Sequence, residues 1–360
     1  MKQQRNDDKI RVGITHGDIN GIGYEIIIKT LLDNRIIELC TPIVYGSSKV
    51  AAYHRKALNI DNFSFNVINF PDEANPKRAN IINCIDEANT KVELGKPTSV
   101  SGIASLRAIE RAISDLKAEK IDVLVTAPIN KHNIQSKDFN FPGHTEYLAS
   151  RFNAQSFLML MVSEIMKVGI VTGHIPVSQV SEQITTESVL TKIRLLNKAL
   201  IEDFAVRRPV IAVLGLNPHA GDDGIIGTED AEIITPAIQK AKEENIMVIG
   251  PFPADGFFGS GSFSKFDAVL AMFHDQGLAP FKAISFEDGI NYTCGLPIIR
   301  TSPAHGTAYE ITGKNEASTS SFRQSIYVAI DAFNNRKNYV QLTANQLQAQ
   351  EAKKPEEQNA

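Results

Sequence analysis

Short apolar runs rich in valine and isoleucine alternate along this chain with segments of helical periodicity, a pattern typical of an α/β protein. In the first half the pattern predicts strands at Arg11–Thr15, Thr41–Tyr45 and Ile121–Val125, and a helix at Tyr24–Leu32. Apolar residues at helical spacing from Ile103 to Leu116 predict a second helix with one apolar face.

The second half repeats this alternation. Its predicted strands are Lys167–Thr172, Val210–Leu216, Ile246–Ile249 and Asp267–Met272, and its predicted helices are Ser188–Glu202 and Glu229–Glu244. Pro236 is expected to disturb the second of these helices, because proline lacks a backbone N–H and its ring clashes with the preceding turn.

The composition narrows the possible function classes. The chain has 360 residues, of which 43% are hydrophobic and 22% charged, and this length suits two globular domains. A net charge of -4 argues against general nucleic-acid binding, which requires clustered lysine and arginine. Apolar runs are too short to cross a bilayer and no signal peptide is recognised, so we expect a cytoplasmic protein with no membrane partner. The 3 cysteines share no metal-ligand spacing, so neither a disulfide scaffold nor a cysteine zinc site is predicted.

Three histidines follow directly after predicted strands. His174 comes after the strand that ends at Thr172, and His219 and His274 follow two later strands in the same way. Because ligands of an open α/β sheet bind at the carboxyl ends of its strands, these imidazoles could meet around one divalent cation. A single histidine in this position is more often a hydrogen-bonded loop residue, and the spacing matches no short metal motif. The pattern alone leaves both interpretations open.

A second group of polar residues is suited to an anionic substrate. Lys282, Asn291 and Arg300 recur at regular spacing after His274, and a lysine, an amide and an arginine together can hold a phosphate group. Such residues on loops are also commonly just solvated. The glycine-containing turn from Gly17 to Gly23 fits neither the dinucleotide-binding nor the P-loop pattern, so its role stays open.

At the level of motifs the chain resembles the 4-hydroxythreonine-4-phosphate dehydrogenase family from about Val12 to Ile330. The residues that carry the resemblance are Gly21-Ile-Gly23, Asn130-Lys131, Gly143-His-Thr-Glu146, Asn217-Pro-His-Ala-Gly221, Gly227-Thr-Glu229, Pro253-Ala-Asp255, His274-Asp-Gln-Gly277, Gly295-Leu-Pro297, Arg300-Thr-Ser302 and His305-Gly-Thr-Ala308.

This resemblance implies an isocitrate and isopropylmalate dehydrogenase-like α/β fold with two domains, 1–135 plus 305–345 and 136–304. The polar composition of the last residues predicts a frayed tail at 346–360. It also implies a homodimer whose active site lies at the subunit interface, with a metal site completed across that interface. The implied metal ligands are His174, His219 and His274, and the implied substrate-binding residues are His144, Thr145, Lys282, Asn291 and Arg300.

The reaction implied by the resemblance is the NAD-dependent oxidation of 4-phosphooxy-L-threonine in pyridoxal phosphate (vitamin B6) biosynthesis. The 3-keto acid then loses carbon dioxide to leave 3-amino-2-oxopropyl phosphate. One divalent metal ion per subunit, with zinc favoured and magnesium or cobalt as alternatives, would polarise the substrate hydroxyl. Lys282 and Asp255 are both candidates for the proton acceptor.

The chain departs from the family pattern at four positions. In the first turn the family usually has proline in place of Ile19 and Tyr24, and His16 is also unusual there; glycine is common in place of Ala127. Three other functions stay open beside the main prediction. The first is a related dehydrogenase of phosphorylated threonate or erythronate, and the second is a metal-dependent hydrolase built on the three histidines. The third is a non-catalytic metabolite-binding protein.

Overall fold

The computed structural model describes residues 9–345, so the predicted tail at 346–360 lies outside the described residues. The strands are β1 (Ile10–Thr15), β2 (Cys40–Gly46), β3 (Asn66–Ile68), β4 (Asn80–Asn83), β5 (Val123–Thr126), β6 (Leu158–Val162), β7 (Lys167–Thr172), β8 (Val210–Leu214), β9 (Met247–Phe252), β10 (Ala268–Phe273), β11 (Ile290–Cys294) and β12 (Arg300–Pro303). The α-helices are α1 (Gly23–Leu31), α2 (Asn34–Leu39), α3 (Ser48–Ala57), α4 (Ser99–Lys117), α5 (His144–Arg151), α6 (Val180–Gln183), α7 (Thr186–Glu202), α8 (Thr235–Glu243), α9 (Ala254–Gly259), α10 (His274–Ser285) and α11 (Ser320–Thr343). Shorter helical turns are η1 (Pro71–Glu73), η2 (Val177–Gln179), η3 (Pro218–Gly224), η4 (Asp230–Ile234), η5 (Ser262–Lys265) and η6 (Tyr309–Ile311).

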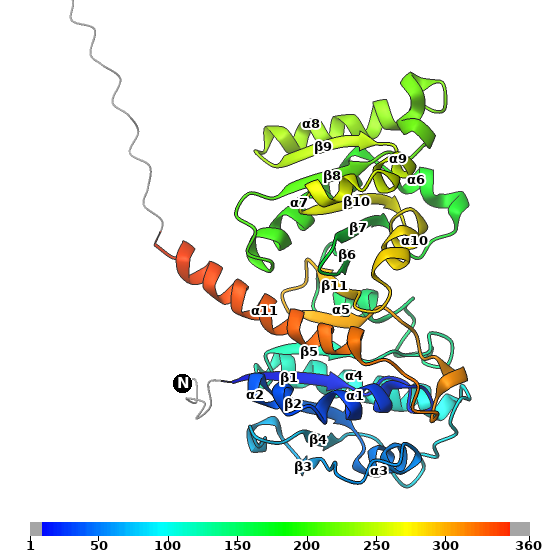
Figure 1. The fold of residues 1–360 in the computed structure, drawn as a ribbon, viewed down its shortest axis with the longest axis vertical. Coiled ribbons are helices and arrows are strands. Elements are labelled where there is room, and N and C mark those ends of the chain that lie inside the picture. Colours follow the sequence, from blue (N-terminus) through cyan, green and yellow to red (C-terminus); the bar gives the residue numbers. More distant parts are fainter. Residues whose placement is uncertain (1–8, 346–360) are drawn as a thin grey trace, which may run out of the picture.

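The strands of the described chain form one 12-stranded sheet, in the order β3-β4-β2-β1-β5-β12-β11-β6-β7-β10-β8-β9 (Figure 1). Neighbouring strands run parallel from β3 to β12 and again from β7 to β9. Between these regions, β12, β11, β6 and β7 pair antiparallel. This architecture confirms the α/β class predicted from the alternation of apolar runs and helical segments.

The sheet runs unbroken across the boundary predicted between two domains. Strand β12 falls inside the second predicted range, 136–304, yet it pairs with β5 of the first range, where Arg300 lies opposite Leu124. On its other side β12 pairs with β11. The division into two domains stays a prediction. Through β12, the strands of the two predicted domains belong to one continuous sheet.

Helices cover both faces of the sheet, and three clusters of buried apolar residues fill the layers between them. The largest cluster extends along the whole length of one face, under α1, α7, α8 and α11. On the other face there are two separate clusters, one under α4 and α5 and one under α9 and α10. The interruption between them leaves the middle of that face available for a cavity.

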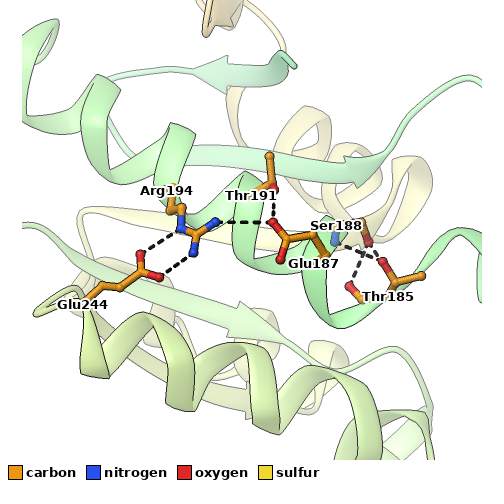
Figure 2. Close-up of polar contacts among 6 residues, drawn as sticks. All are labelled: Thr185, Glu187, Ser188, Thr191, Arg194 and Glu244. Atoms are coloured by element: carbon orange, nitrogen blue, oxygen red, sulfur yellow. Dashed lines mark hydrogen bonds and ion pairs between the residues drawn. The ribbon is translucent and has the colours of Figure 1, made fainter. Parts of the chain in front are cut away.

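Local sequence signals explain where the long helices begin. Thr185 precedes α7, and its side chain accepts a hydrogen bond from the backbone of Ser188, whose own side chain bonds back to Thr185 (Figure 2). This reciprocal capping box satisfies N–H groups that a helix start leaves unpaired. Further along α7, Arg194 pairs with Glu244 at the end of α8 through Nε at 2.8 Å (Figure 2). The two helices are therefore tied together above the same face of the sheet.

Two predicted helices differ in detail from the observed ones. The helix predicted at Glu229–Glu244 is divided into a π-helical turn, η4, and the α-helix α8, which has Pro236 in its first turn, so the expected disturbance is confirmed. In α4, Ile103 is 53% exposed and not on the apolar face as predicted, while Ala104 and Ala108 are buried instead.

Within residues 9–345, none of the helices combines the length and the hydropathy that crossing a membrane requires.

Candidate active site

A cavity of about 280 Å³ lies over the antiparallel centre of the sheet. Its floor includes Met159 and Met161 of β6 and Arg300 and Ser302 of β12. Residues two apart on a strand point to the same face, so each of these strands contributes a pair of side chains. The loop after β5 and the loop after β12 form walls. The start of α5, the helix α10, Asn291 of β11 and His174 beyond the end of β7 complete the lining. The cavity thus occupies the gap between the two separate apolar clusters.

Arg300 is the most deeply buried cation of the cavity, with 2% of its surface exposed. Its four hydrogen bonds go to the hydroxyl groups of Thr126, Thr145 and Thr293, so within residues 9–345 no carboxylate accepts from it. Burial lowers the pKa of Arg300 to about 10, and Glu146 opposes this shift. Within the described chain the charged guanidinium is therefore hydrogen-bonded only to neutral groups. A buried charge without a counter-ion favours binding of an anion.

His144 and Thr145 form the first turn of α5 and both line the cavity. The ring nitrogen Nε2 of His144 is buried without a hydrogen-bond partner. Burial, together with the charges of Arg300 and Lys131, lowers the pKa of His144 well below its usual value, so the imidazole is neutral. A neutral imidazole can donate one N–H to a substrate without adding charge.

Three more polar atoms that line the cavity are buried without a partner: Oδ1 of Asn291, Oε2 of Glu146 and Nε2 of His305. Buried polar atoms in folded proteins are almost always hydrogen-bonded, so unpaired ones around a cavity indicate a place for a ligand. Lys282, on α10, lines the same cavity and is itself exposed. All five residues expected to bind substrate therefore line one cavity.

His174 and His274 are neighbours in the cavity lining, with their ring centroids 5.6 Å apart. Nδ1 of His174 lies 3.4 Å from Glu146, and Nδ1 of His274 lies 2.7 Å from Asp275. A carboxylate beside Nδ1 favours the tautomer that carries its proton there, and this leaves the lone pair on Nε2. In metal sites such carboxylates orient the ligating histidine in the same way. These two imidazoles fit one side of a divalent metal site.

The third expected ligand, His219, is not among the residues that line the cavity. Strands β7, β10 and β8 are parallel neighbours, but His219 follows β8 only after the loop 215–217 has led the chain into η3. Among residues 9–345, no group of three histidine, cysteine, aspartate or glutamate side chains is arranged to hold a metal ion. The three implied ligands therefore do not come together within the described part of this chain.

The backbone around His219 is unusual. Residues 219–223 all have positive φ, from 44° at Asp222 to 85° at Gly221. This left-handed conformation costs roughly 1–2 kcal/mol for each residue that is not glycine, and such strain is concentrated at functional sites. His219 is exposed, and so is Asp255 at the start of α9, which also lies outside the cavity. Of the two candidate proton acceptors, the structure brings only Lys282 to the cavity.

Among the ionisable residues that line the cavity, three have no role predicted from the sequence: Lys131, Glu146 and His305. Nζ of Lys131 lies 3.4 Å from Nε2 of His174. All three stand inside the motifs that carry the family resemblance, so this location was the only signal that marked them. Their charges and spacing alone gave none.

Comparison with known proteins adds independent evidence. The family model for the pyridoxal phosphate biosynthetic protein PdxA matches residues 38–329. The 4-hydroxythreonine-4-phosphate dehydrogenase of Bacteroides thetaiotaomicron is 53% identical over 345 residues, which is 96% of this chain and 94% of the relative. A relative from Oceanobacillus iheyensis, provisionally named D-threonate 4-phosphate dehydrogenase, is 40% identical over 323 residues, or 89% of this chain and 97% of the relative.

Among solved structures, the 4-hydroxythreonine-4-phosphate dehydrogenase of Klebsiella pneumoniae superposes with a TM-score of 0.79 at 32% identity. The similarity covers 91% of this chain and 99% of the other. It confirms that this chain has the α/β fold of a solved 4-hydroxythreonine-4-phosphate dehydrogenase.

Proposed function

The chain belongs to the family of the pyridoxal phosphate biosynthetic protein PdxA, and on this premise we propose that it oxidises 4-phosphooxy-L-threonine with NAD as the acceptor. A hydride leaves carbon 3 for NAD, and the hydroxyl proton passes to a base. The product is a β-keto acid, with the new carbonyl at carbon 3 and the carboxylate attached to carbon 2, so it loses carbon dioxide readily. A proton then replaces the carboxylate on carbon 2, which gives 3-amino-2-oxopropyl phosphate.

The observation that carries this proposal is the buried guanidinium of Arg300, which is contacted only by hydroxyl groups within the described chain. The substrate phosphate supplies the missing anion. Asn291 and the neutral His144 offer polar atoms without partners beside it, and Lys282 adds a second positive charge. A phosphate held in this way also fixes the position of the reacting carbon, so that binding energy contributes to the rate.

We propose that His174 and His274 hold a divalent metal ion together with His219 of a second copy of the chain. The two imidazoles fit this role because a carboxylate lies beside Nδ1 of each and leaves the lone pair on Nε2. In His174 this lone pair faces Nζ of Lys131 at 3.4 Å, which the ion would displace. Zinc suits three imidazole ligands best, and magnesium and cobalt are alternatives. When bound, the ion would supply Lewis acidity that stabilises the alkoxide form of the substrate.

The position of His219 supports the proposal of a second copy. Its turn is exposed and leads into Ile225 and Ile226, which are 81% and 38% exposed. The edge strand β9 also exposes Met247 and Ile249. Exposed apolar residues near an incomplete ligand set favour an interface that covers them. The homodimer with its active site at the interface therefore stays our proposal, as does a cytoplasmic location.

Within one chain, Lys282 is the better placed proton acceptor, because it lines the cavity and Asp255 does not. The cavity of about 280 Å³ suits a small phosphorylated acid and is too small for a dinucleotide as well. The loop after β12 would help to hold NAD, because Gly306 has open space beside it and Nε2 of His305 lacks a hydrogen-bond partner.

A phosphorylated threonate is the alternative substrate, because the Oceanobacillus relative carries that name. The two substrates differ at carbon 2, which bears an amino group in one and a hydroxyl in the other. A side-by-side assay of NADH formation from 4-phosphooxy-L-threonine and D-threonate 4-phosphate decides between them. We expect the larger kcat/KM with the amino acid, and a higher value with threonate phosphate would overturn this choice. NADH formation from neither would overturn the dehydrogenase function itself.

A further inference from the structure

The turn between β1 and α1, residues 16–22, lies behind the two loops that form walls of the cavity, although its own residues do not line it. The N–H of Asp18 donates to the carbonyl of Pro128 in the first loop at 2.8 Å, and the N–H of Ile22 donates to the carbonyl of Thr307 in the second at 3.1 Å. Gly17 has a φ of 73°, and a Cβ there would lie 2.3 Å from the Pro128 oxygen. The close contact between this turn and the first loop therefore requires glycine.

The carboxylate of Asp18 is fully buried and accepts four hydrogen bonds. Oδ1 accepts from the backbone N–H of Asn20 at 2.8 Å. Oδ2 accepts from Ser101 at 3.0 Å, from Asn133 at 2.8 Å and from Tyr309 at 2.8 Å. The last two donors come from segments that continue the two wall loops, so one carboxylate connects both of them.

Tyr309 makes this connection direct. Its hydroxyl donates to Asp18 and accepts from Nδ2 of Asn130 at 3.0 Å. Burial and the Asp18 carboxylate raise the pKa of Tyr309 above its usual value, so the hydroxyl keeps the proton that it donates. Asn130 directly precedes Lys131, which lines the cavity, and Tyr309 closely follows His305, which lines it from the other loop.

We propose that Asp18 is a positioning residue that, through Tyr309 and Asn133, holds the two wall loops in the relative arrangement that substrate oxidation requires. This inference rests on the proposed dehydrogenase function. Loops are less constrained than the strands that they connect, so their relative position depends on such bonds. Misplacement of binding groups by about 1 Å can lower a rate on the order of a hundredfold.

The test compares two tyrosines, each of which donates a hydrogen bond to an aspartate carboxylate. Tyr309→Phe removes the bond to Asp18, and the control Tyr45→Phe removes a bond of 3.0 Å to Asp115 away from the cavity. We expect Tyr309→Phe to lower kcat/KM for 4-phosphooxy-L-threonine about tenfold or more, while Tyr45→Phe leaves it unchanged. The unfolding midpoints of the two variants should fall by similar amounts.

Hydrogen exchange of the backbone amides of residues 305–311 gives a readout that needs no activity. Exchange should accelerate in Tyr309→Phe and stay unchanged in Tyr45→Phe. Asp18→Asn should cause both effects more strongly, because an amide cannot accept every bond that the carboxylate does. Unchanged exchange, a kcat/KM of Tyr309→Phe within about twofold of wild type, or an equal loss in the control would overturn the proposal. Wild-type protein that forms no NADH would refute the proposed function, and hydrogen exchange would still decide whether Asp18 orders the loop.

Discussion

Two nitrogens of the Arg300 guanidinium donate to the hydroxyl oxygen of Thr126, Nε at 3.1 Å and Nη2 at 2.7 Å. Thr126 ends β5 and Arg300 begins β12, which is its parallel neighbour. The paired bonds fix the plane of the guanidinium without neutralising it. The arginine is thereby oriented by the sheet and keeps its charge for the substrate.

Thr126→Val should therefore weaken substrate binding while the fold is kept. Valine has the shape of threonine but cannot accept from Arg300, so the guanidinium loses its orientation and a buried donor is left unpaired. We expect KM to rise about tenfold and the free energy of unfolding to fall by about 1–3 kcal/mol. Steady-state kinetics and urea denaturation measure the two effects.

Thr301→Val is the matched control, because Thr301 is a buried neighbour of Arg300 whose hydroxyl donates to the carbonyl of Ser325 at 2.8 Å. It does not line the cavity. A similar rise in KM in this variant would show that Thr126 acts through the fold alone.

Glu146→Gln should weaken metal binding. Its carboxylate lies 3.4 Å from Nδ1 of His174, and the neutral amide that replaces it favours the proton on that nitrogen less strongly. Loss of such an orienting group lowers metal affinity about 10- to 100-fold. Calorimetric titration of metal-free protein with zinc measures the affinity directly. Glu187→Gln, on the surface of α7 (Figure 2), serves as the control, and equal affinities in all three proteins would contradict the prediction.

A site shared between two copies predicts complementation. His174→Ala and His219→Ala should each be inactive, because each lacks one ligand in every site. In a mixture that exchanges subunits, one site of each mixed dimer takes its intact His174 from one chain and its intact His219 from the other. About a quarter of wild-type activity should return with equal amounts of the two chains. Mixtures that stay as inactive as their components would exclude a shared site.

Stability should fall in mild acid because of two buried histidines. Burial lowers the pKa of His16 and of His54 to about 4, whereas the unfolded chain titrates near 6.5. Between these values the unfolded state binds more protons, so the free energy of unfolding decreases as the pH is lowered from about 6.5 to about 4. Each histidine contributes at most about 1.4 kcal/mol per pH unit. Urea denaturation at a series of pH values measures this slope.

His54→Gln tests the contribution of one group. The glutamine amide can still donate to the carbonyl of Ile19, which Nε2 of His54 contacts at 2.7 Å, but it does not titrate. The slope should therefore decrease relative to wild type, while the exposed loop variant His132→Gln keeps it. If His54→Gln has the wild-type slope, this histidine does not cause the acid sensitivity.

The periodicity of the sequence predicted seven of the strands, and it missed the short strands β3 and β4 at one edge of the sheet as well as β6, β11 and β12 at its centre. Strands such as β1 and β7 are continuous apolar runs, because both of their faces are buried. Strands β11 and β12 carry polar residues toward the cavity, among them Asn291 and Arg300, and this interrupts the apolar pattern. These two strands therefore could not be recognised from a run of apolar residues.

For the site, the placement of histidines after strands correctly marked an edge of the sheet, and the structure brings His174 and His274 together there. It could not show that His219 turns away, because the left-handed run 219–223 depends on tertiary contacts. Two such contacts are made by the buried Asp230, which accepts from the backbone N–H groups of Leu216 and Asn217. Neither the turn nor its exposure has a signature in local sequence.

The pairing of β12 with β5 has a consequence for biosynthesis. Under the cavity, Arg300 of β12 pairs with Leu124 of β5. The ribosome adds these two residues many seconds apart, at about 5–20 residues per second. A nascent chain can collapse around its amino-terminal strands during that interval, but the edge of β5 stays open until β12 emerges. Premature termination before Arg300 would leave a bare strand edge prone to aggregation, and no catalytically competent fragment.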